Sequence, residues 1–256
     1  MGNRVYRPIM VEHTGQDLRG SRFANSDLRD SWFREVDMRG THFRGVFLMD
    51  AEIDGEIDGL TIHGVEVAPL VEAELDRRHP ERAALRATTP EELRAGWAGL
   101  EGMWAATLER VAAMPPETTD ISVDGEWSFS QTLRHLVLAT DAWLGLAVLQ
   151  RENPFHPLGV LFSEWRGHEA ELGIDADASP SYAQVLEARE DRAAMVRDFL
   201  AHVTADELAA ASGARPPWEK HGSPTTLECL QVVMNEEWQH HRFAVRDLGA
   251  IEAGRV

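Results

Sequence analysis

The first third of the chain places an apolar side chain at every fifth position. A smaller residue stands two positions before most of these centres, and polar or charged residues fill most of the rest. Such a period matches neither the 3.6 residues of a helical turn nor the two-residue alternation of a strand. It suits a square solenoid, in which each five-residue unit forms one side and four units complete a turn. The eight centres, spread over residues 16–55, therefore predict about two turns: Leu18, Phe23, Leu28, Phe33, Met38, Phe43, Leu48 and Ile53.

A short connecting region follows the repeats. Apolar residues continue over 56–67 without the five-residue spacing, which predicts a strand-like cap. The segment 70–78 then has a helical pattern that ends before Pro80, because proline disfavours a helical conformation in the residue before it.

Four longer helical patterns make up the rest, over about residues 89–113, 128–150, 181–202 and 225–248. The first begins with a capping threonine followed by a proline, which is a strong helix start. Short links favour antiparallel neighbours, whereas residues 151–180 are long enough to cross the bundle. We therefore predict a mainly α protein, a four-helix bundle with one long crossover preceded by a short right-handed quadrilateral β-helix of about two turns. The expected domains are a repeat at 1–68, a connector at 69–87 and a bundle at 88–256.

The composition limits the classes of molecule that the protein is expected to bind and the cellular compartment in which we expect it. The chain has 43 acidic and 25 basic residues, a formal charge of -18, which opposes binding to nucleic acid or to anionic membranes. No apolar run is long enough to span a bilayer, the first 25 residues lack a secretory signal, and Cys229 is the single cysteine. We expect a cytoplasmic protein without disulfides that acts on a small molecule, with a homodimer left open. Among its basic residues only Lys220 is a lysine, a bias typical of GC-rich genomes.

The last helical pattern contains two ionisable residues where its spacing predicts a core. Glu237 and His241 continue the apolar stripe through Leu230 and Met234. A buried carboxylate needs a partner charge, hydrogen bonds or a metal. His135, in the second pattern, also faces inward and could approach them. Two imidazoles and a carboxylate suit a divalent metal with room for a further ligand.

Simpler interpretations compete with this metal triad. An inward histidine can be a hydrogen-bonded core residue, and a Glu–His pair four residues apart can be a bond within the helix. Glu236 and His240 repeat the same spacing one residue earlier and offer a second register. They fall beside the apolar stripe, so we assign them to its flank and predict His135, Glu237 and His241 as the ligands.

Two family resemblances are consistent with these interpretations. Units such as Ser26-Asp-Leu-Arg-Asp30 and Thr41-His-Phe-Arg-Gly45 resemble pentapeptide repeats. Some long members of that family mimic DNA, but residues 1–68 carry 8 arginines among 12 acidic residues and form no anionic face, which favours a structural or dimer-forming role. Residues 88–249 resemble the DinB/YfiT-like four-helix metalloproteins, on the segments Trp127–Leu136 and Asn235–Arg242.

The second resemblance carries expectations about chemistry. In that family a histidine of the second helix and a His-X-X-X-His pair of the last helix bind a divalent metal, positions that we match to His135, Glu237 and His241. Glutamate in the middle is similar to the variant in mycothiol-dependent maleylpyruvate isomerase-like members, which bind zinc; nickel or iron are alternatives. Mycothiol is an actinobacterial thiol, in keeping with the arginine bias. The resemblance implies a metal-dependent thiol transferase or isomerase, with a noncatalytic ligand-binding or scaffolding protein and a metal-dependent hydrolase as alternatives.

Overall fold

The computed structural model describes residues 11–220 and 222–255 and divides the chain into two compact units. The division falls between Asp50 and Ala51. Residues 51–68, which we expected to belong to the repeat domain, are thus grouped with the bundle. The first ten residues of that expected domain lie outside the described part.

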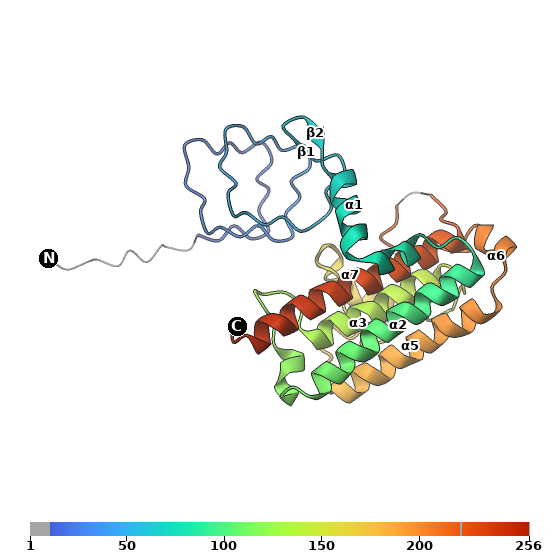
Figure 1. The fold of residues 1–256 in the computed structure, drawn as a ribbon. Coiled ribbons are helices and arrows are strands. Elements are labelled where there is room, and N and C mark those ends of the chain that lie inside the picture. The colour runs from blue at the N-terminus through green and yellow to red at the C-terminus, as the bar shows by residue number, and fades with distance from the viewer. Residues whose placement is uncertain (1–10, 221, 256) are drawn as a thin grey trace. The chain divides into compact units, whose positions relative to one another are not determined.

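Unit 1 is a coil of five-residue segments (Figure 1). Its corners are left-handed: the residue two positions after each centre has positive φ, including the non-glycine residues Asn25, Asp30 and Glu35. The centres themselves stay open to solvent, with Phe23 65% and Met38 37% exposed. In a coil of about two turns, each turn forms one end. The central side chains of a turn are therefore covered by another turn on one side at most.

Unit 2 begins with a small hairpin and a connector. The segment expected to be strand-like contains β1 (Thr61–Ile62) paired antiparallel with β2 (Val65–Glu66). Helix α1 (Ala68–Arg78) and the 3-10 helix η1 (Pro80–Arg86) follow. Arg82 of η1 is buried, pairs with two carboxylates of α1 and lies 4.9 Å from the ring of Trp238.

Four long helices form the bundle, as the mainly α prediction requires. Each starts with a capping box, in which a Ser or Thr side chain and the Glu or Gln three residues later satisfy each other's backbone N–H groups. The second helix is α-helical for twelve residues and then continues as a π-helix, η3 (Asp141–Leu146). The four helices are α2 (Pro90–Ala112), α3 (Phe129–Thr140), α5 (Tyr182–His202) and α7 (Thr226–Glu252).

Shorter elements connect these helices. They are η2 (Pro116–Asp120), η4 (Ser163–Trp165), α4 (Glu169–Leu172) and α6 (Ala205–Ala209). In the described part of the chain, no helix is apolar enough over a sufficient length to cross a membrane.

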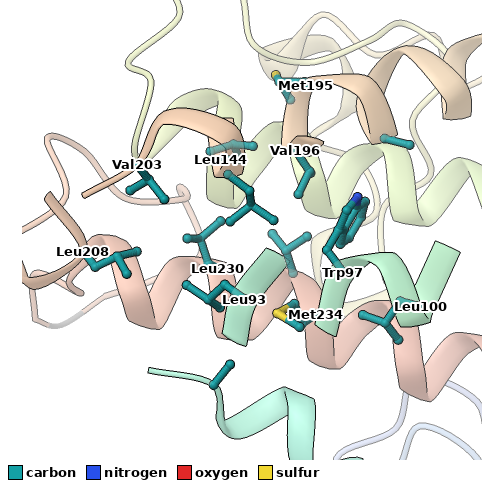
Figure 2. Close-up of a cluster of buried hydrophobic side chains, with 14 of the residues drawn as sticks. Leu93, Trp97, Leu100, Leu144, Met195, Val196, Val203, Leu208, Leu230 and Met234 are labelled. Carbon is teal, nitrogen blue, oxygen red and sulfur yellow. The ribbon is translucent and has the colours of Figure 1, made fainter. Parts of the chain in front are cut away.

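The core lies where the apolar stripes of the four helices meet. Figure 2 shows Leu93 and Trp97 of α2 packed with Val196 of α5 and with Leu230 and Met234 of α7. A second cluster fills the other half of the bundle around Trp104, Leu133 and Leu248. These contacts fix α3 and α7 side by side, and the candidate site lies between those two helices.

The predicted crossover from α3 to α5 packs against the bundle. Leu161 and Ile174 form a small apolar cluster with Leu138 of α3. Arg134 donates a hydrogen bond from Nε to the Leu158 carbonyl oxygen at 2.7 Å. The crossover backbone is thereby held beside α3.

Candidate metal centre

Three side chains with metal-binding atoms meet between α3 and α7. His135 comes from α3, and Glu236 and His240 come from α7. One ligand atom from each lies within 4.8 Å of the other two. Residues four apart stand on one face of a helix, so Glu236 and His240 present their side chains together toward α3.

Both imidazoles approach the same carboxylate oxygen. The Nε2 atom of His240 lies 3.1 Å, and the Nε2 atom of His135 3.4 Å, from Oε2 of Glu236. In a tetrahedral shell with bonds of about 2.0–2.1 Å, ligand atoms are roughly 3.4 Å apart. The two nitrogen-to-oxygen distances, and the donor set of two nitrogens and one carboxylate oxygen, therefore suit a zinc-like divalent ion.

A backbone carbonyl of the crossover orients His135. Its Nδ1 lies 3.0 Å from the Val160 carbonyl oxygen, which can only accept a hydrogen bond. His135 therefore carries its proton on Nδ1 when neutral and turns the lone pair of Nε2 toward Glu236. An outer partner of this kind fixes the tautomer and the ring orientation of a metal-binding histidine.

Trp127 covers the two histidines from the loop before α3. Its ring lies 4.4 Å from that of His135 and 5.7 Å from that of His240, with tilts of 36° and 31°. The backbone places it there through a tight turn in which Asp124 and Gly125 both have positive φ and Glu126 N donates to the Val123 carbonyl oxygen. The cluster thus has an apolar wall on the Trp127 side, while the Glu236 side chain keeps 31% of its surface exposed.

Electrostatics in the cluster favour an ionised carboxylate on Glu236 and a neutral imidazole on His240. Burial alone would raise the pKa of Glu236, but the neighbouring side chains of His135 and His240 outweigh it and hold that pKa below its usual range. Burial lowers the pKa of His240, and the Glu236 carboxylate opposes this only in part. An ionised carboxylate and unprotonated imidazoles are the forms that bind metals.

Two family models match the chain. The model of the DinB superfamily matches residues 99–244, and that of pentapeptide repeats matches 14–51 in eight copies. The chain belongs to the DinB superfamily. It is a metal-binding DinB-like protein, and its candidate cluster lies inside the matched range. No curated protein and no solved structure matches the chain significantly.

The structure of this DinB protein brings together a different pair on α7 from the one that we predicted as ligands. His135 lies in the cluster, whereas Glu237 and His241 do not join it, and their preceding neighbours Glu236 and His240 lie there instead. The apolar stripe correctly identified the buried face of α7, because Glu237 is 1% exposed. The cluster lies on the flank of that stripe, where we had placed the alternative pair.

The two displaced residues have other partners in the core. Glu237 Oε2 accepts a hydrogen bond at 2.5 Å from Arg189 Nη2, which extends from α5. His241 Nε2 lies 2.9 Å from the Thr107 hydroxyl of α2. The partner charge that a buried carboxylate requires is therefore an arginine.

Sequence reasoning missed Arg189, Val160 and Trp127 as neighbours of the site. Arg189 could have been found from the sequence pattern, because it interrupts the apolar face of α5 between Val185 and Val196. Glu237 interrupts the apolar face of α7 in the same way. Val160 contributes a backbone oxygen, which no side-chain pattern reveals.

Proposed function

We propose that this protein is a metal-dependent enzyme that transfers or adds a low-molecular-weight thiol, of which mycothiol is the first candidate, to a small electrophile, or isomerises a substrate through such an adduct. The observation that carries the proposal is the convergence of His135, Glu236 and His240 at ligand spacing, with the carboxylate still partly exposed. Zinc suits this nitrogen and oxygen donor set, and nickel or iron would also fit it.

A bound divalent metal would lower the pKa of a thiol that coordinates it, so that the sulfur is a nucleophilic thiolate at neutral pH. His135 and His240 provide neutral nitrogen ligands, and Glu236 provides the negative charge that offsets the ion. Trp127 closes one side, so that reactants approach from the exposed side of Glu236. The sulfur forms the new bond to carbon, and its proton passes to solvent when a leaving group departs, or to the adjacent carbon in an addition.

The chain's own cysteine is unsuited to supply the sulfur. Cys229 is buried on α7, and burial raises the pKa of its thiol to about 11. A buried thiol with a raised pKa is unreactive near neutrality. Thiol chemistry at this site therefore requires a soluble thiol, which favours a transfer reaction over an internal cysteine nucleophile.

Metal content and thiol dependence test this proposal together. Protein purified without chelator should hold about one transition metal per chain, and 1-chloro-2,4-dinitrobenzene should be conjugated faster than the uncatalysed background only when both mycothiol and metal are present. The matched controls are the chelator-treated protein and the Glu236→Gln variant, which should both be inactive. Hydrolytic turnover of ester substrates without thiol would favour the hydrolase, and a metal-loaded protein without any turnover would favour the noncatalytic alternative.

A further inference from the structure

Helix α7 carries two overlapping Glu-X-X-X-His pairs, and only one of them faces His135. The pairs are Glu236 with His240 and Glu237 with His241. Successive residues on an α-helix are rotated by about 100°. A rotation of α7 by that amount would therefore present the second pair to α3 with the same chemistry and the same spacing.

The second pair is held by polar partners from the other two helices. Arg189 of α5 binds Glu237, and Thr107 of α2 binds His241 one turn further along α7. Trp104 of α2 packs against the second pair, with its ring 5.0 Å from that of His241. Burial raises the pKa of Glu237, and the Arg189 guanidinium opposes that rise.

The Arg189 contact spans the bundle. Helices α5 and α7 pack mainly on α2 and α3 and are diagonal to each other, as Figure 1 also shows. Arg189 and Glu237 are 9% and 1% exposed, so the pair is formed inside the core. Nη1 of Arg189 and Oε1 of Glu237 lack a hydrogen-bond partner among the described residues. A buried pair with unsatisfied atoms contributes little to stability compared with packed apolar side chains, but it can specify one arrangement over another.

We propose that Arg189, assisted by Thr107, is a positioning residue that selects which Glu–His pair of α7 meets His135. By binding Glu237 in the core, Arg189 removes that carboxylate from competition and fixes the rotation of α7 at which Glu236 and His240 face α3. The inference rests on the proposed metal site and adds to it the residues that set its register.

Cobalt(II) binding to the full chain tests register selection, because the visible spectrum of cobalt reports its ligands independently of activity. Arg189→Leu leaves Glu237 buried without its partner charge, so we expect at least a tenfold loss of cobalt affinity and an altered spectrum. Adding Glu237→Leu removes the competing carboxylate and fills the core with two apolar side chains. We expect that double variant to recover the wild-type spectrum and an affinity within about threefold of wild type.

A second test variant applies if Arg189→Leu does not fold, and a control variant accompanies both. Thr107→Val frees only His241 and should lower cobalt affinity by about threefold. Glu101→Gln removes an exposed ion pair between α2 and α5, formed with Arg197, and should leave cobalt binding unchanged.

Each outcome separates the two proposals. Wild-type protein that binds no cobalt would overturn the metal site and, with it, register selection. Wild-type affinity and spectrum in Arg189→Leu, or in Thr107→Val should the former not fold, would overturn register selection alone. So would a double variant that folds but does not recover cobalt binding.

Discussion

The two Glu–His pairs of α7 have identical spacing, yet their surroundings give them different roles. Glu236 keeps 31% of its side chain exposed and has two imidazoles beside it, whereas Glu237 is fully enclosed and has a guanidinium. Burial and ligand function are therefore separated by a single residue. On α7, the charge of the more buried carboxylate, Glu237, is compensated by Arg189. The candidate ligand Glu236 lies at the edge of the core, where its side chain is accessible to solvent.

Removing a carboxylate from each pair should give the largest contrast in metal binding. Glu236→Ala is expected to weaken zinc binding by roughly a thousandfold, since zinc sites gain several kcal/mol for each ligand. Glu237→Gln should retain most of the affinity, because the amide oxygen can still accept the hydrogen bond from Arg189. Competition with a coloured chelator measures both constants, and equal losses in the two variants would contradict the separation of roles.

The same two positions should rank in the opposite order for folding stability. Glu237→Ala leaves Arg189 buried without a counter-charge and should lower the free energy of unfolding by about 3–5 kcal/mol. Glu236→Ala in metal-free protein should lower it by less, because the Glu236 side chain is partly exposed and its removal leaves no guanidinium buried without a counter-charge. Urea unfolding of the metal-free variants measures the difference; a larger loss from Glu236→Ala would reverse our assignment.

Cys229 is a further buried ionisable group of α7. Because burial raises the pKa of its thiol to about 11, the folded protein should contain almost no thiolate at pH 8. We expect a thiol-reactive dye to label native protein at least about a hundredfold more slowly than urea-unfolded protein, whose thiol regains its ordinary pKa. Rapid labelling of the native protein would show that the chain can supply its own sulfur nucleophile.

The exposed ion pairs of unit 1 should have the smallest effect. Asp27 and Arg29 form a close pair at 2.6 Å, but both side chains are largely exposed, and surface pairs of this kind add little to stability. Arg29→Ala should leave the thermal unfolding midpoint of the protein unchanged within error. A clear decrease would mean that this pair contributes as the buried Arg189–Glu237 pair does.

Much of the fold could be predicted because its signals are local. The five-residue spacing marked the coil, and the capping threonine, Thr89, marked the start of the first long helix. The π-helical turn at Asp141 could not be predicted. It lies in a continuous helical pattern, and Asp141 is buried against Arg192, which is distant in sequence.

The candidate cluster and the predicted ligands differ by one residue along α7. The helical pattern showed correctly that Glu237 points into the core, but it could not show which partner compensates its charge. That depended on Arg189, which is 48 residues away and reaches across the bundle. The orientation of His135 depended on the Val160 carbonyl, and a backbone contact of this kind follows from the path of the crossover rather than from residue types.

The most direct test of the central claim is a crystal structure of the zinc-loaded protein with anomalous diffraction recorded at the zinc absorption edge. We predict one anomalous peak per chain. It should mark a zinc ion bound to Nε2 of His135, an oxygen of Glu236 and Nε2 of His240, with Glu237 still paired to Arg189. A peak bonded to Glu237 or His241, or zinc bound only away from His135, would contradict the account.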